Sequence, residues 1–201
     1  MDALRSAPSC PIRYVHYIKQ AGALFRSPLN LAVTPLWIDM KIQEIDGENW
    51  HGILEIQGEA YQEIGLEDLE VLKSKLAASP NTCFVSLSDQ GTVLGYLLAH
   101  PWNGSTPPKL FEPLPDITAS EYLYLHDMAV NSQSKGQGIG RAMFEELVGV
   151  ALKTGIQEIR LVAVQGSGSF WSFLGFREIP GATVCSSYGE NAVLMEKVLT
   201  A

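Results

Sequence analysis

The chain has 201 residues, of which 46% are hydrophobic and 18% are charged, and this composition suits one well-buried domain and excludes a disordered protein. Its formal net charge of −8 at pH 7 argues against nucleic-acid binding, which needs a basic surface. No apolar run reaches the length of about 18 residues that a membrane-spanning helix needs, and Cys10, Cys83 and Cys185 lack the spacing of a metal site or a disulfide framework. We therefore expect a cytoplasmic protein with no metal and with neither nucleic acid nor membrane as a partner.

The first 39 residues differ from the rest of the chain. They contain four prolines and short apolar patches without a sustained period. From Met40 apolar and polar residues alternate, as they do in a half-buried strand. We interpret residues 1–39 as an N-terminal extension and residues 40–201 as the folded domain, with an arm that packs on the domain or on a partner as the alternative.

Beyond Met40 the hydrophobic pattern predicts alternating helices and strands. One helix ends before Pro80, and the turn Asp89-Gln90-Gly91 joins two strands as a hairpin. The loop over 101–120 is long and rich in Pro, Gly, Ser and Thr, as functional or mobile loops are. We predict strands near 40–45, 82–87, 92–99, 121–130, 158–164, 182–186 and 192–199, and helices near 48–61, 66–78, 138–154 and 167–174. This order indicates an α/β domain around a mixed sheet.

The region of the first two helices is acidic, with Glu55, Glu59, Glu63, Glu67 and Asp68. We interpret them as a solvated helix face. A wall that attracts a cationic molecule is the alternative.

A glycine-rich turn follows the strand that ends at Val130. Gly136, Gly138 and Gly140 open an amphipathic helix, and glycines there leave uncovered backbone N–H groups that have no partner within the helix. Together with the helix dipole these groups form an anion site, to which Lys135 and Arg141 add charge. The pattern is neither Gly-x-Gly-x-x-Gly nor a Gly-Lys-Ser or Gly-Lys-Thr loop, which excludes both common nucleotide motifs.

The segment Lys135-Gly136-Gln137-Gly138-Ile139-Gly140 resembles the signature of the GNAT superfamily of acetyltransferases, in which Gln or Arg usually stands in place of Lys135. A second stretch, from Phe170-Trp171 to Gly175-Phe176, resembles the family's later motif, although Trp171 stands where a tyrosine is usual. The resemblance spans about Met40 to Leu199. It implies the GNAT acyl-CoA N-acyltransferase fold, with a mixed, mostly antiparallel central sheet flanked by helices.

The resemblance also implies acetyl-CoA as co-substrate. Backbone N–H groups from Gln137 to Ala142 would hold the pyrophosphate, and the strand end at Met128 to Val130 would pair with the pantetheine arm. The residues expected at the coenzyme are Met128, Ala129, Val130, Lys135, Gly136, Gln137, Gly138, Ile139, Gly140, Arg141, Ala142, Gln165, Phe170 and Trp171.

Acetyl transfer to an amine requires a neutral nucleophile, whereas an alkyl ammonium with a pKa of about 10.4 is protonated at pH 7. His126 is the candidate base, because its ring titrates in the useful range, and Asp127 would orient a neighbouring group or bind the substrate ammonium. Polar residues in an apolar strand need compensation, and a structural hydrogen-bonded pair is the alternative. In the family a carboxylate often lies near the position of Tyr124. Strand alternation puts Tyr124, His126 and Met128 on one face and Asp127 on the other.

In the family a tyrosine at the position of Trp171 commonly protonates the leaving thiolate. An indole N–H is not acidic enough for this step, so another residue would have to donate the proton. Tyr188, in the turn before the last strand, is our candidate. An ordinary turn tyrosine, or a mechanism without a dedicated acid, is the alternative. The oxyanion donor would be the backbone N–H of Met128 or Val130.

The function we expect is transfer of acetyl from acetyl-CoA to a primary amine of a small molecule, a polyamine or a protein. The alternative is a non-catalytic, coenzyme A-binding regulatory module, which Trp171 and the missing carboxylate favour. Pairing as a homodimer is common among similar proteins, and the sequence itself carries no sign of it.

Overall fold

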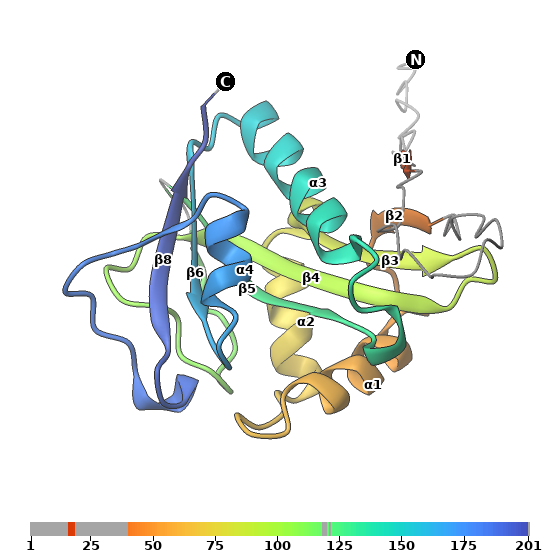
Figure 1. Ribbon diagram of the computed structural model, residues 1–201, viewed down its shortest axis with the longest axis horizontal. Coiled ribbons are helices and arrows are strands. Elements are labelled where there is room, and N and C mark those ends of the chain that lie inside the picture. Colours follow the sequence, from red (N-terminus) through yellow and green to blue (C-terminus); the bar gives the residue numbers. More distant parts are fainter. Residues whose placement is uncertain (1–15, 19–39, 118–119, 121, 201) are drawn as a thin grey trace, which may run out of the picture.

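The computed structural model describes residues 16–18, 40–117, 120 and 122–200, and these residues form one mixed sheet with helices on both faces (Figure 1). The strand order is β1-β2-β3-β4-β5-β6-β8-β7. The strands are β1 (His16–Ile18), β2 (Met40–Glu44), β3 (Cys83–Ser88), β4 (Val93–Trp102), β5 (Tyr122–Val130), β6 (Glu158–Ala163), β7 (Arg177–Glu178) and β8 (Val193–Val198). The helices are α1 (Trp50–Ala60), α2 (Leu69–Ala78), α3 (Ile139–Lys153) and α4 (Gly168–Phe173), with short 3-10 turns at Pro80–Thr82, Ser132–Ser134 and Ser186–Tyr188.

Neighbouring strands in this sheet run antiparallel except for β5 and β6, which run parallel. This confirms the expected mixed, mostly antiparallel sheet. Side chains alternate across β4, so Leu97 and Ala99 join the core under α3, whereas Tyr96 and Leu98 join the core under α1 and α2. In Figure 1, α3 accordingly lies on one side of the sheet and α2 on the other.

β5 and β6 separate soon after they meet. Their pairing consists of Leu123 with Ile159 and Tyr124 with Arg160, although β5 continues to Val130 and β6 to Ala163. β5 meanwhile stays paired with β4 as far as Val130. The sheet is therefore split between the carboxyl ends of β5 and β6.

A β-bulge lies at the same place. Leu98 faces Asp127 and Ala99 faces Leu125, so His126 is an extra residue in β5 with no counterpart in β4. After the bulge Met128 packs against the core under α3, and Asp127 bonds to side chains on the α1 side of the sheet. Tyr124 and His126 share a face as predicted, but Met128 joins the face of Leu125. The predicted alternation is therefore wrong beyond His126, because one inserted residue reverses it.

The predicted strand over 182–186 is also wrong. The chain there is irregular up to the 3-10 turn. β8 pairs with β6 on one side and, on the other, with β7, which follows α4. Pro180 and Gly181, whose φ is 73°, turn the chain away from the sheet, and the β-branched residues that follow were a misleading signal.

Of residues 1–39, only the backbone of His16–Ile18 is described, and it pairs antiparallel with β2. The rest of the predicted extension lies outside the described residues, so the boundary at Met40 stays a prediction. Among the described helices, none is long and apolar enough to cross a membrane.

We expect Gly95→Ala to destabilise the protein. A Cβ at Gly95 would lie 2.9 Å from the carbonyl oxygen of Ala129 and 3.1 Å from Cε of Met143, so β4 and β5 would have to move apart. Overpacking of this kind costs about 1–3 kcal/mol. Urea denaturation measures this loss in the free energy of unfolding.

Gly58→Ala is the matched control, because a Cβ at Gly58 in α1 meets no heavy atom within 4 Å. This control should be neutral or stabilising by up to about 1 kcal/mol. Equal stabilities for the two variants would contradict the close approach of β4 and β5.

Candidate functional site

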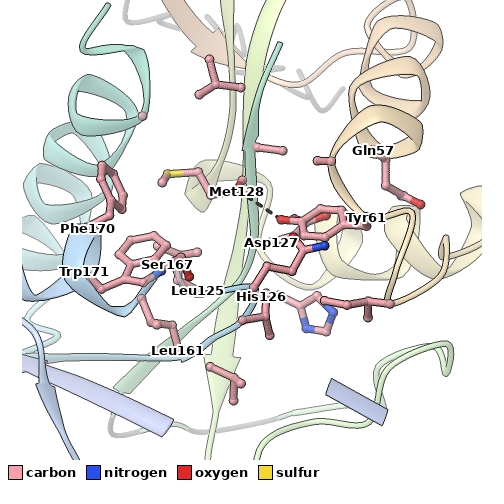
Figure 2. Close-up of a pocket in the computed structure, with 18 of the residues that line it drawn as sticks. Gln57, Tyr61, Leu125, His126, Asp127, Met128, Leu161, Ser167, Phe170 and Trp171 are labelled. Carbon is pink, nitrogen blue, oxygen red and sulfur yellow. Dashed lines mark hydrogen bonds between the residues drawn. The ribbon is translucent and has the colours of Figure 1, made fainter. Parts of the chain in front are cut away.

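A pocket with a volume of about 560 Å³ opens where β5 leaves β6. Its walls come from the end of α1 and the loop after it, the first turn of α3, and α4. Figure 2 shows Phe170 and Trp171 on one side, Gln57 and Tyr61 on the opposite side, and Met128 of β5 between them. Phe111 closes a further part of the wall from the long loop after β4.

The glycine turn builds one end of this pocket. Gly136 and Gly138 have φ angles of 78° and 81°, a left-handed conformation that favours glycine, and Gly138 is the N-cap of α3. The first three helical residues have N–H groups without an acceptor inside the helix, and the N–H of Ala142 is the first to donate within it, to Gly138 O at 3.0 Å. The anion site therefore ends at Arg141.

The structure brings most of the residues expected at the coenzyme to this pocket. Its wall includes Met128, Ala129, Val130, Lys135, Gly136, Gly138, Ile139, Gly140, Arg141, Gln165, Phe170 and Trp171. Gln137 and Ala142 are not on this wall. The side-chain amide of Gln137 bonds to Gln133 O at 3.4 Å, and the side chain of Ala142 is buried in the core under α3.

Trp171 takes part in both the pocket wall and the core. Its ring makes edge contacts with Phe170, Phe144 and Phe176, at centroid distances of 5.0, 6.4 and 5.5 Å. Aromatic contacts of this geometry stabilise the packing of α4 on α3. The indole therefore has a packing role at the position where a tyrosine was expected to be an acid.

Asp127 is held by two tyrosine hydroxyls. Tyr61 donates to Oδ1 at 2.5 Å and Tyr96 donates to Oδ2 at 2.6 Å. Burial raises the pKa of Asp127 to about 6, and the charge of Glu67 adds to the rise, whereas the two tyrosine hydrogen bonds and Lys75 lower the pKa by less. Asp127 therefore changes charge close to neutral pH, in a pocket wall.

His126 belongs to a second group of buried polar side chains. Its Nε2 lies 3.3 Å from Oε2 of Glu67, and Nζ of Lys75 lies 3.0 Å from the same oxygen. Burial lowers the pKa of His126, so the ring is neutral at pH 7. Burial also opposes ionisation of Glu67, but its contacts with His126 and Lys75 outweigh that effect and lower its pKa.

Glu67 is therefore not part of a solvated helix face. It lies in the loop after α1, lines the pocket, and its Oε1 accepts a hydrogen bond from the backbone N–H of Phe111 at 2.8 Å. That bond ties the long loop after β4 to the α1–α2 loop. Gln57 is also on the wall, and its buried amide has no hydrogen-bond partner among the described residues.

Tyr188 and Tyr124 meet beside the pocket. Their hydroxyl oxygens are 3.3 Å apart, and the Tyr188 hydroxyl donates to Pro108 O at 2.6 Å. Tyr188 lines the pocket, whereas Tyr124 is buried and does not. Burial raises the pKa of both phenols above their ordinary value.

Sequence reasoning missed Tyr61, Tyr96, Lys75 and Gln57. Tyr61 follows α1 and reaches Asp127 across 66 positions of the chain, and no local motif marks such a contact. The signal for Lys75 was its position on the apolar face of an amphipathic helix, beside Val71 and Leu72. A lysine there needs a partner, because lysine is almost never fully buried without one. Among the described residues, no group of His, Cys, Asp and Glu could hold a metal ion.

Comparison with known proteins supports one family. Residues 50–176 match the sequence profile of the acetyltransferase (GNAT) family. No curated protein matches the chain by sequence.

Solved structures agree with the sequence profile on the fold. Ard1 from Thermoplasma volcanium is 15% identical with a TM-score of 0.63, covering 81% of this chain and 99% of that one. The ribosomal-protein-S18-alanine N-acetyltransferase from Escherichia coli is 15% identical with a TM-score of 0.60, covering 81% and 95%. Arabidopsis thaliana Naa50, solved with the bisubstrate analogue CoA-Ac-MVNAL, is 12% identical with a TM-score of 0.58, covering 79% and 97%.

We expect Lys75→Met to destabilise the protein by about 3–5 kcal/mol, because it leaves the Glu67 carboxylate buried without its nearest cation. The Lys75 side chain is fully buried and that of Glu67 is 9% exposed. The double variant Lys75→Met with Glu67→Gln removes the unpaired charge and should recover part of the loss. Urea unfolding of the two variants checks this, and a single variant as stable as the wild type would contradict the pairing.

Proposed function

The chain belongs to the GNAT acetyltransferase family, and from that premise we propose that it is an N-acetyltransferase that moves the acetyl group of acetyl-CoA to a primary amine. The observation that carries this proposal is the split between β5 and β6, which has the glycine turn at one end and a titratable carboxylate at the other. The acceptor is a small amine, a polyamine or a protein amine. The analogue bound to Naa50 joins coenzyme A to a peptide, which makes a peptide amine one of the acceptors to test.

In this proposal acetyl-CoA occupies the split sheet. Beyond Tyr124 the backbone of β5 has no pairing with β6, and buried backbone groups need partners, so the pantetheine amides are suitable partners for it. The pyrophosphate binds at the first turn of α3, where helix N–H groups and the helix dipole favour an anion. Lys135 and Arg141 lie on the pocket wall and supply positive charge there.

The acceptor amine enters from the side of α1 and attacks the thioester carbonyl carbon. The amine must first lose a proton, and Asp127 and His126 are the proposed groups for this step because both line the pocket. The tetrahedral oxyanion receives a hydrogen bond from the backbone N–H of Met128 or Val130. The carbon–sulfur bond then breaks, and the electron pair leaves with the coenzyme A sulfur.

Tyr188 is the proposed donor of a proton to that sulfur. It lines the pocket, and Tyr124, whose hydroxyl lies 3.3 Å away, positions it from the core. Donation requires the Tyr188 hydroxyl to turn from Pro108 O, which holds it at 2.6 Å. Trp171 then needs no acid role and keeps its place in the aromatic packing.

We expect Gly138→Glu to abolish acetyl-CoA binding. The substitution adds a negative charge at the proposed pyrophosphate site and a side chain at a residue with φ of 81°. Calorimetric titration of acetyl-CoA into the folded variant measures the effect. An affinity equal to that of the wild type would contradict the pyrophosphate assignment.

Two control variants separate the effect of a negative charge at residue 138 from the effects of a charge elsewhere on α3 and of backbone strain. Gly149→Glu puts the same charge on α3 at a residue where a Cβ meets no heavy atom within 4 Å, and it should bind acetyl-CoA as the wild type does. Gly138→Ala carries the backbone strain without the charge, so its loss of affinity should be smaller than that of Gly138→Glu.

A further inference from the structure

We propose that Tyr61 is a catalytic residue, which takes a proton from the acceptor amine while it passes its own hydroxyl proton to Asp127. This inference rests on the proposed acetyl transfer and names the first proton acceptor in that reaction. Tyr61 lies directly after α1, and Figure 2 shows its ring extending across the pocket wall to Asp127 and Met128.

The hydroxyl of Tyr61 has two neighbours on β5. Its oxygen is 2.5 Å from Oδ1 of Asp127 and 3.2 Å from the carbonyl oxygen of Met128. A hydroxyl has one proton to donate, and the shorter contact with a carboxylate is the stronger one. The proton therefore points to Asp127, and the Tyr61 oxygen and the Met128 carbonyl become two acceptors 3.2 Å apart.

Two converging acceptors with a carboxylate behind them are a site for an N–H donor. An ammonium group has several such protons and a positive charge, which the nearby Asp127 carboxylate attracts. Both Tyr61 and Met128 line the pocket. The acceptor nitrogen is therefore placed beside the same part of β5 that is proposed to receive the thioester.

The two oxygens of the Asp127 carboxylate accept hydrogen bonds from different tyrosines, and Tyr96 is the one away from the pocket. It donates to Oδ2 at 2.6 Å, is fully buried, and does not line the pocket. Tyr61 donates to Oδ1 and does line the pocket. Of the two tyrosines that donate to Asp127, Tyr61 is the one on the pocket wall, so its hydroxyl is the one placed to pass a proton from the acceptor to the carboxylate.

The step conserves protons and charge. One N–H bond of the ammonium breaks and an O–H bond forms on Tyr61, while the former Tyr61 O–H bond breaks and an O–H bond forms on Asp127. The products are a neutral amine, a neutral tyrosine and a protonated Asp127. The amine's lone pair is then free to attack the thioester carbon.

The groups that face Asp127 fit this role. They are Tyr61 after α1, Tyr96 of β4, Glu67 in the loop after α1, and Lys75 of α2, with His126 as its neighbour in β5. Glu67 and Lys75 neutralise each other at 3.0 Å. Burial remains the main effect and raises the pKa of Asp127 to about 6, so the carboxylate is ionised at pH 7 and can be protonated during a turnover.

The test compares Tyr61→Phe with the wild-type protein. Thiol release from acetyl-CoA is measured across pH with spermidine, phenylethylamine, glucosamine and a short peptide with a free N-terminus, and acetyl-CoA affinity is measured by calorimetry. For the wild type, kcat/KM should rise as the pH increases through about 6, because Asp127 must be ionised to accept the proton. Tyr61→Phe should lower kcat/KM about 100-fold and change the acetyl-CoA Kd less than twofold.

Tyr96→Phe is the matched variant, because it removes the other hydroxyl from the same carboxylate. That hydrogen bond lowers the pKa of Asp127, so its loss should move the acid limb of kcat/KM to higher pH, with no 100-fold loss on the alkaline plateau. Tyr61→Phe with wild-type kcat/KM and the wild-type pH profile would overturn the relay and leave acetyl transfer in place. A wild-type protein that binds acetyl-CoA but releases no thiol with any of the amines would overturn the proposed function, and the relay with it.

Discussion

The separation of β5 from β6 is the feature on which the rest of the site depends. The two strands pair only at Leu123 and Tyr124 of β5, whereas β4 continues to hold β5 on its other edge. A backbone edge inside the protein that lacks a neighbouring strand has polar groups to satisfy, and this edge borders the pocket. The bulge at His126 lies where the strands part, and it turns Asp127 toward the helices α1 and α2. One inserted residue thus turns a carboxylate toward the pocket that borders the separated strands.

The acidic groups at the α1 side of the pocket have different roles because they have different partners. Glu67 is neutralised by Lys75, contacts His126 and anchors the backbone of Phe111, which makes it a structural link between two loops. The direct partners of Asp127 among the described residues are two tyrosine hydroxyls, so burial dominates and its pKa rises to about 6. A carboxylate whose pKa is close to neutrality can take up and release a proton during a reaction. In the proposed reaction, Glu67 therefore takes part in charge compensation and Asp127 in proton transfer.

The features of the fold and the site that could be predicted from the sequence are local. Gly136 and Gly138 could be recognised because alternate glycines at the start of an amphipathic helix leave its backbone N–H groups uncovered, and hydrophobic periodicity predicted α1, α3 and most strands. The bulge could not be predicted, since an extra residue at position 126 is defined only against the strand that pairs with it. The contact between Tyr61 and Asp127 depends on how α1 crosses the sheet. The strand expected at 182–186 failed because β propensity there is overridden by the turn at Gly181.

Hydrogen exchange of the backbone amides, with and without acetyl-CoA, tests most directly whether the coenzyme occupies the split between β5 and β6. If the coenzyme binds there, acetyl-CoA slows exchange in peptides covering residues 126–130 and the start of α3 at residues 137–141, and leaves exchange in α2 and β3 unchanged. Slower exchange at the start of α3 alone would keep the anion site and contradict the pairing with β5. Unchanged exchange in both segments at saturating acetyl-CoA would contradict the account as a whole.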